Sequence, residues 1–262
     1  MERLHRKPIL FRVTCLGALI LLGSMSPALA QDDAPEPYTY VAEWTIARDQ
    51  WQGYAEWAAR NTRPILERLA ADGTLLGWGF FETYVHTPDQ STHGLWWTAA
   101  TFAGIEKTRT ELVKAPFHPA AAAGAHRDYL LRVGAHGGRP GSVAGGFLYV
   151  NSQYVKPGQG SVWADLWEKN AKPVLDELVA AGALASYGVY TEDVHTETST
   201  QRMIVTISTS AAAEDQIEAA FRAASATRTE AERETLAQKN RELTDAPAHR
   251  DYMARVTAAW FK

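Results

Sequence analysis

The sequence is poor in cysteine: of its 262 residues, only Cys15 carries a thiol, and it lies near the beginning of the chain. Residues 31–262 therefore hold no disulfide, no thiolate nucleophile and no cysteine-ligated zinc or iron–sulfur site. A chain of this length can bury a core large enough to fold without such cross-links. Its stability must come from packing, to which nine tryptophans contribute.

Long apolar runs are also lacking, except in residues 1–30. This segment reads MERLHRKPILFRVTCLGALILLGSMSPALA: a basic start, an apolar stretch and then Ala28-Leu29-Ala30. That order is typical of a secretory signal peptide, and the apolar stretch is too short and too interrupted for a transmembrane helix. We predict cleavage after Ala30 and a periplasmic or secreted protein without a membrane segment. The lack of disulfides fits a bacterial periplasm.

Positive charge is scarce as well. Without residues 1–30 the chain has 22 Lys and Arg against 29 Asp and Glu, a formal charge of −7. This balance argues against a nucleic-acid partner. The sequence also contains no phosphate-binding glycine loop, no dinucleotide-binding fingerprint, no HExxH and no GxSxG motif. We therefore expect no metal and no cofactor, and no serine triad or nucleotide site is supported.

What the chain does contain is an internal repeat. The phrase AHRDYLLRV at 125–133 returns as AHRDYMARV at 248–256, and VHT at 85–87 returns at 194–196. The pattern N-x-[RK]-P-[IV]-L-[ED]-x-L-x-x-x-G-x-L occurs in both copies, and the second copy carries 14 more residues before its AHRDY phrase. We predict a first repeat at 38–133, a glycine-rich linker at 134–146 and a second repeat at 147–262, which contains a longer helical region at 211–245.

Each copy predicts the order strand, helix, two strands, helix, strand. In the first copy these are a strand at 38–47, a helix at 51–71 divided by Pro64, strands within 74–86 and 93–101, a helix at 102–114 and a strand from 126. This is the ferredoxin-like βαββαβ plan. Because helices cover only one face of such a sheet, the other face needs a partner. The fold class is therefore predicted as α+β, with two tandem repeats packed sheet to sheet.

The repeated helix-to-strand pattern and the paired βαββαβ order resemble the dimeric α+β barrel superfamily, here fused into one chain. The resemblance implies a pseudo-dimeric barrel that is either a monomer or a homodimer. That superfamily includes cofactor-free monooxygenases, muconolactone-isomerase-like enzymes, haem-binding chlorite-dismutase-like proteins and many members without assigned activity. A shared fold does not transfer function.

Strand alternation divides the repeated phrase between two faces. The face with Arg127, Tyr129, Leu131 and Val133 is more apolar and is predicted to pack under the helices. The other face is predicted to look into the barrel and supplies the candidate catalytic and ligand-binding residues: His126, Asp128 and Arg132, and their second copies His249, Asp251 and Arg255. These groups either pair with one another and fix the sheet register, orient an anionic or carbonyl-bearing ligand, or include a catalytic histidine.

Other histidines are weaker candidates. His86 and His195 repeat at strand ends, where a histidine either contacts a ligand or bonds the loop backbone. His93, His118 and His136 do not repeat and are expected to be solvated.

Three functions follow from these residues. The first is an exported barrel that binds a small organic molecule without transforming it. The second is a cofactor-independent monooxygenase or isomerase, with His126 or His249 as base and Arg132 or Arg255 stabilising an oxyanion. The third, by resemblance, is a chlorite-dismutase-like haem protein. Its axial histidine would be expected in the second repeat, where only His195 and His249 stand and both lie outside 211–245.

Overall fold

The computed structural model describes residues 36–87, 90–195 and 199–262. The predicted signal peptide at 1–30 lies outside the described residues, so the structure does not test this prediction. No helix among the described residues has the length and apolar character needed to cross a membrane.

The described chain alternates strands and helices in the predicted order. The strands are β1 (Tyr38–Trp44), β2 (Gly77–Thr83), β3 (His93–Ala99), β4 (His126–Gly138), β5 (Gly141–Val143), β6 (Phe147–Tyr154), β7 (Leu184–Glu192), β8 (Gln201–Ser208) and β9 (Arg250–Phe261). The helices are α1 (Trp51–Asn61), α2 (Arg63–Ala71), α3 (Phe102–Leu112), α4 (Pro119–Ala123), α5 (Gly160–Asn170), α6 (Lys172–Ala180), α7 (Ala211–Ala226) and α8 (Glu230–Leu243).

The strands form one antiparallel barrel. Their order is β2-β3-β1-β4-β7-β8-β6-β9, and β9 pairs with β2 to close the ring, while β5 pairs with the end of β9. The first half (β1–β4) and the second half (β6–β9) therefore have the same internal strand order. The two four-stranded sheets join edge to edge through β4–β7 and β2–β9, instead of lying face to face as predicted. Closure satisfies the backbone groups that four free sheet edges would leave unpaired.

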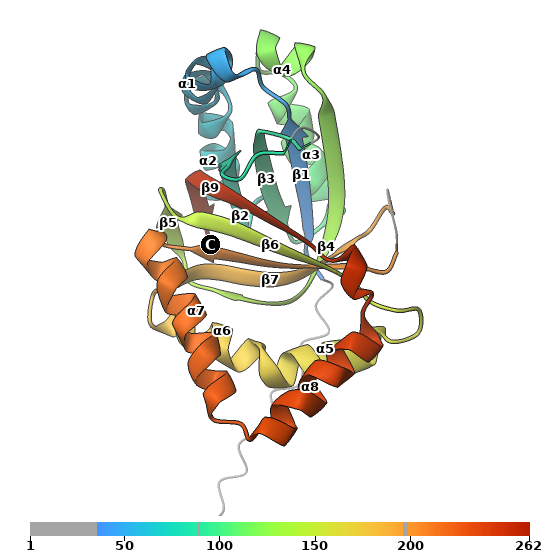
Figure 1. Cartoon of the computed structure of the whole chain (residues 1–262). Helices are drawn as coiled ribbons and strands as arrows, with labels where there is room; N and C mark the ends of the chain where they lie inside the picture. Colours follow the sequence, from blue (N-terminus) through green and yellow to red (C-terminus); the bar gives the residue numbers. More distant parts are fainter. Residues whose placement is uncertain (1–35, 88–89, 196–198) are drawn as a thin grey trace, which may run out of the picture. The chain divides into compact units, whose positions relative to one another are not determined.

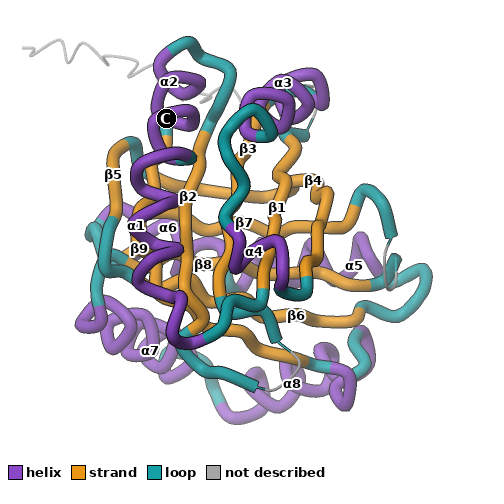
Figure 2. The backbone as a smooth tube through the Cα atoms, turned by 90° about the horizontal axis from the view of Figure 1, so that it is seen from above, coloured by secondary structure: helices purple, strands orange, loops and turns teal. Residues whose placement is uncertain are grey.

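The helices lie outside the barrel in two groups. Figure 1 shows α1–α4 on one side of the strands and α5–α8 on the opposite side. Figure 2, seen from above, shows the helices of the first half over strands β1–β3.

The segment predicted as a linker, 134–146, is largely part of the sheet. Residues 134–138 complete β4, of which 136–138 pair with β7, and β5 pairs with β9. Gly141 and Gly145 have φ angles of 134° and 78°, which favour glycine over other residues. The prediction that this segment is a flexible linker is therefore wrong, because much of it is strand. Its glycines instead allow tight turns between paired strands.

Local sequence signals explain the helices. Pro64 divides the predicted helix 51–71 into α1 and α2, and it stands in the first turn of α2, where its missing N–H costs no hydrogen bond. The predicted helical region 211–245 is likewise two helices, α7 and α8. Thr229 and Glu232 form the predicted capping box at the start of α8, with Oε2 of Glu232 2.7 Å from the Thr229 nitrogen.

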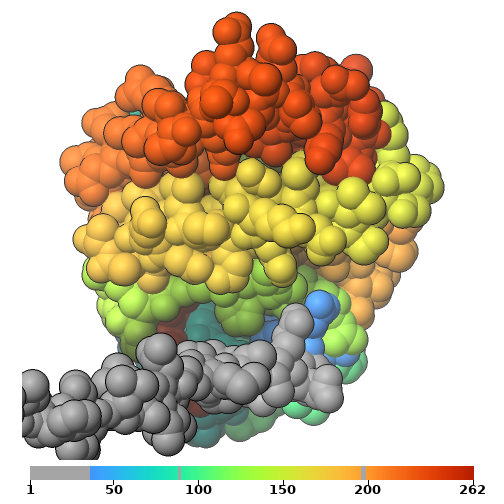
Figure 3. Space-filling model, turned by 90° about the horizontal axis from the view of Figure 1, so that it is seen from below, coloured from blue at the N-terminus to red at the C-terminus, as the bar shows by residue number. Residues whose placement is uncertain are grey.

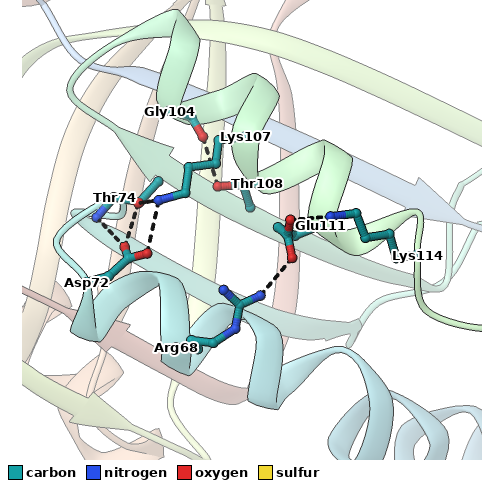
Figure 4. A network of polar contacts seen from close by, with 8 residues as sticks. All are labelled: Arg68, Asp72, Thr74, Gly104, Lys107, Thr108, Glu111 and Lys114. Atoms are coloured by element: carbon teal, nitrogen blue, oxygen red, sulfur yellow. Dashed lines mark hydrogen bonds and ion pairs between the residues drawn. The ribbon is translucent and has the colours of Figure 1, made fainter.

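Ion pairs tie α2 to α3 at the surface (Figure 4). The Lys107 ammonium donates to Asp72 at 3.0 Å and to Thr74 at 2.7 Å, and Arg68 pairs with Glu111 at 2.9 Å. These side chains are substantially exposed, so the network orients the two helices more than it stabilises them.

Apolar packing forms three clusters, separated by the barrel wall. One lies between the first-half helices and the outer face of β1–β3, a second lies between the second-half helices and β7–β8, and a third fills part of the barrel interior. Inside, the Trp96 ring lies over Gly79 and the Phe81 ring lies over Gly94; a Cβ at either glycine would lie 2.0 Å from the ring. Glycine at these two positions lets each ring lie against the neighbouring strand of the β2–β3 pair without a clash.

Candidate functional site

The barrel encloses a cavity of about 730 Å³. This volume is within the range of about 300–1,000 Å³ that holds small organic ligands. The middle of the cavity is apolar and is lined by Val41, Phe81, Trp96, Leu131, Val133, Leu148, Val150, Met203, Val205 and Ile207. An apolar middle of this kind favours a hydrocarbon or aromatic ligand, because burying such surface is favourable.

The face of β4 and β9 that looks into the barrel is the opposite of the one predicted. The more apolar face, with Tyr129, Leu131 and Val133, lines the cavity. A closed barrel shields its interior on all sides, whereas the helices only partly cover the outer faces of β4 and β9. The prediction that the polar face looks inward is therefore wrong. It concerned six residues: His126, Asp128, Arg132, His249, Asp251 and Arg255. Of these, only His126 and Asp251 reach the rim of the cavity.

The polar residues on the outer face pair with one another. This agrees with the interpretation that these groups fix the sheet register. His126 Nε2 lies 3.0 Å from Asp128, and the His126 ring stacks on Trp44 at 5.1 Å between ring centres. His249 Nε2 lies 3.1 Å from Asp251, which also accepts a hydrogen bond from Asn151. These contacts join neighbouring strands and help to fix their register.

The remaining candidates also lie outside the barrel interior. Arg132 donates to Asp193 at 2.8 Å, and its guanidinium lies 3.6 Å from the centre of the Tyr38 ring. The Arg255 side chain is exposed. His86 and His195 are exposed at the ends of β2 and β7; neither lines the cavity, and the His86 ring lies 5.0 Å from that of Trp51.

A different set of polar residues closes one end of the cavity. The strand pairings place the beginnings of β4 and β9 at the same end as the last residues of β1, β2 and β7. We call this end the polar end and define it by Glu43, Thr83, Ser91, Arg127, Tyr129 and Tyr252. Glu43 of β1 stands directly opposite Arg127 of β4 in the sheet register, and both line the cavity.

Hydrogen bonds hold the polar end together. The Thr83 hydroxyl donates its one proton to the Ser91 carbonyl oxygen, at 2.6 Å. In the hydrogen bond between Thr83 and Tyr252, at 2.7 Å, the Tyr252 hydroxyl is therefore the donor. On the other side, Arg127 donates to the Tyr129 hydroxyl at 3.0 Å. The Glu43 carboxyl interacts electrostatically with both Arg127 and Tyr252, which these bonds hold in place.

Burial changes the acid–base behaviour of this group. It raises the pKa of the Glu43 carboxyl above its usual value, while the hydrogen bond with Ser91 and the charge of Arg127 act in the opposite direction. Burial also raises the pKa of Tyr252, and the negative charge of Glu43 adds to this effect. A carboxyl with a raised pKa beside a cation can accept a proton from a bound molecule, while the cation stabilises the anion that forms.

The two halves of the barrel differ at this end. Ser152 stands opposite Arg250 in β6–β9, where Glu43 stands opposite Arg127 in β1–β4. At the strand ends, Thr83 closes β2 and Glu192 closes β7. The polar end is therefore asymmetric, with one register-paired glutamate and arginine.

Sequence reasoning missed Glu43. Its only signal is a charge on the same face of β1 as Thr39 and Val41, and this becomes informative only when the inward face is known. His93 was also misjudged. It is only 5% exposed, it lies under α1 with its ring 5.1 Å from that of Tyr54, and its Nε2 has no partner among the described residues. Burial, with a smaller contribution from the nearby His86, lowers the pKa of His93 to about 4.

No described group of three or more histidine, cysteine or acidic residues is arranged to hold a metal ion.

Comparison with known proteins identifies the fold of this chain but does not assign it to a family. No family model matches the sequence, and no curated protein matches it. The structure is similar to a crystal structure described as a "putative monooxygenase" from Lactobacillus acidophilus NCFM, with a TM-score of 0.59, 9% identity, and coverage of 86% of this chain and 96% of that one. A second structure with the same description, from Fusobacterium nucleatum, gives a TM-score of 0.58 and 9% identity, covering 87% and 95% of the two chains. The chain thus has the fold of the dimeric α+β barrel proteins.

Proposed function

We propose that this chain is an exported protein whose barrel cavity binds a small, largely apolar organic molecule, with the polar group of that molecule directed at Glu43 and Arg127. One observation carries the proposal: a carboxyl with a raised pKa, paired in register with an arginine, closes one end of an apolar cavity of about 730 Å³. The signal-like residues 1–30 support export, and the repeated phrases support an origin by duplication of one barrel half.

The shape of the site selects the ligand class. The apolar middle favours a ring system or short hydrocarbon, and the polar end offers an acceptor and a cation side by side. A hydroxyl or enol group satisfies both, since its proton can bond Glu43 while its oxygen accepts from Arg127. Because only one half of the barrel has the register-paired glutamate, we expect one ligand molecule per chain.

Binding of 2-naphthol to residues 31–262 tests this proposal. By titration calorimetry we expect one molecule to bind per chain. Glu43→Gln removes a charge-assisted hydrogen bond worth about 1.5–3 kcal/mol, so it should weaken binding about tenfold or more. Val150→Trp should abolish binding by filling the cavity that Val150 lines. The matched control is Glu56→Gln, which changes an exposed glutamate on α1 and should leave the affinity unchanged.

Either of two results would contradict the binding proposal. One is the absence of 2-naphthol binding to the folded protein. The other is binding that Val150→Trp leaves intact, which would place the molecule outside the barrel.

A second candidate function, cofactor-independent proton transfer, is favoured by the raised pKa of Glu43. In this function Glu43 removes a proton from a carbon next to a carbonyl group, and Arg127 stabilises the enolate oxygen. Such a step begins an isomerisation, and it also begins the cofactor-free oxidation of an activated carbon. The monooxygenase description of the two similar structures agrees with this candidate but belongs to those proteins.

Hydrogen exchange at the acidic CH₂ of 2-tetralone measures that step. We expect the protein in D₂O to accelerate the loss of the proton NMR signal, and Glu43→Gln to slow exchange by about 10²-fold or more, the usual contribution of a general base. Equal rates for the protein and for Glu43→Gln would exclude Glu43 as the base and leave the binding proposal standing.

Among the described residues of the second half, no histidine lines the cavity where it could serve as the axial ligand of a haem. The described inward positions of β6–β9 are occupied by residues such as Leu148, Val150, Val205 and Tyr252, and none of them is histidine. These residues do not fit a haem with a histidine ligand from the second half.

A further inference from the structure

A second pocket lies outside the barrel, between α5 and α8. Its volume is about 320 Å³, and it does not share a lining residue with the barrel cavity. Figure 3 shows α8 at the red end of the colour scale and α5 in yellow on the same face of the protein. In the first half, α4 has 5 residues where α8 has 14. The pocket therefore belongs to the insertion that distinguishes the second half.

Two arginines supply the charge of this pocket. Within the described residues, neither Arg228 nor Arg233 forms an ion pair. Arg228 donates to the Asn170 side-chain oxygen at 3.1 Å, and Arg233 donates to the Arg228 carbonyl oxygen at 2.6 Å. The acidic neighbour, Glu232, accepts from Thr229 in the capping box, and the charge of Arg228 contributes to the lowered pKa of Glu232. A guanidinium has five donor N–H groups, so both arginines keep donors for a further acceptor.

The opposite wall is apolar and aromatic. Trp163, Leu166, Trp167 and Leu236 line it. Trp163 donates its indole N–H to Gln153 at 3.0 Å. Trp167 is only 7% exposed, and its indole N–H is buried without a hydrogen-bond partner among the described residues.

We propose that this pocket binds a small aromatic carboxylate. The carboxylate oxygens accept from Arg228 and Arg233, which suit the planar, two-oxygen group, and the ring packs against the tryptophans and leucines. An uncharged aromatic molecule would gain only the apolar contacts. The inference does not depend on the function proposed for the barrel.

Benzoate binding to residues 31–262 tests the proposal, with benzyl alcohol as the uncharged comparison. By calorimetry we expect benzoate to bind at millimolar or lower concentration, at least tenfold more tightly than benzyl alcohol, and more weakly as salt is added. Arg233→Gln and Arg228→Gln should each weaken benzoate binding at least tenfold. Arg233 is exposed, so its variant should fold normally even if Arg228→Gln does not.

Two control variants locate the binding. Arg222→Gln removes an exposed arginine of α7 that pairs with Glu218 and does not line the pocket, and it should leave benzoate affinity unchanged. Val150→Trp fills the barrel cavity and should also leave it unchanged. The proposal is overturned if wild-type protein does not bind benzoate, if Arg233→Gln binds it as well as wild type, or if Val150→Trp abolishes binding. The last result would place benzoate in the barrel.

Discussion

Two titratable residues show how burial determines acid–base behaviour in this protein. Glu43 lines the barrel cavity beside Arg127, and His93 lies under α1 among aromatic rings. Burial disfavours the charged form of each group, so it raises the pKa of the carboxyl and lowers that of the imidazole. Only Glu43 faces a space that a ligand can enter, which is why we assign it the chemistry and assign His93 a packing role.

His93 should make stability depend on pH. Its pKa is about 4 in the folded protein, against 6.5 in the unfolded chain. The neutral ring therefore contributes stability above pH 6.5, and this is lost as the pH falls toward 4. Between pH 7 and pH 4.5 the loss should be about 2 kcal/mol. Urea unfolding at the two pH values measures it. His93→Gln should lose less stability than wild type over this range, whereas the exposed His136→Gln should behave like wild type; equal pH dependence in all three would refute the assignment.

At the scale of single elements, most of the secondary structure could be predicted because its signals are local. Pro64 marks the junction of α1 and α2, and Thr229 with Glu232 marks the start of α8. The alternation of β4 was also correct. Which of its faces looks inward could not be deduced, because this depends on how completely the other elements cover each side. The glycine-rich composition of residues 134–146 suggested a linker for a similar reason. That these residues form strands depends on their partners β7 and β9, which are distant in the sequence.

The glycine of β2 tests the packing of that strand. In Gly79→Ala the new Cβ would lie 2.0 Å from the Trp96 ring, so the ring must move. We expect a loss of about 1–3 kcal/mol in the free energy of unfolding, the usual cost of overpacking. In the matched control Gly53→Ala, on α1, no atom lies within 4 Å of the added Cβ. That change should stabilise the protein by up to about 1 kcal/mol, since alanine is the better helix former. A neutral Gly79→Ala would show that the interior packing differs from that described.

At the scale of the whole molecule, the repeat was the most informative signal in the sequence. Phrases repeated far apart, such as AHRDY, predicted two halves with the same element order. In the structure β2-β3-β1-β4 and β7-β8-β6-β9 follow each other in the same order in the two halves. The way in which the halves join could not be predicted, because edge pairing between β4 and β7 or between β2 and β9 leaves no local pattern. The site was missed for the same reason, since the polar end takes residues from four strands and a loop.

Barrel closure within one chain predicts the oligomeric state. Because β2 pairs with β9 of the same chain, the barrel leaves no sheet edge of its eight strands for a second copy. We expect residues 31–262 to be monomeric when light scattering is measured during gel filtration. A stable dimer at micromolar concentration would show that the external helices, and not the barrel strands, form an interface.

The most direct test of the central claim is a crystal structure with 6-bromo-2-naphthol, whose bromine can be located by its anomalous signal. The account predicts one strong bromine peak inside the barrel, near Val150, with the hydroxyl group within hydrogen-bond distance of Glu43. A bromine peak only outside the barrel, or the naphthol hydroxyl directed away from Glu43 and Arg127, would contradict it.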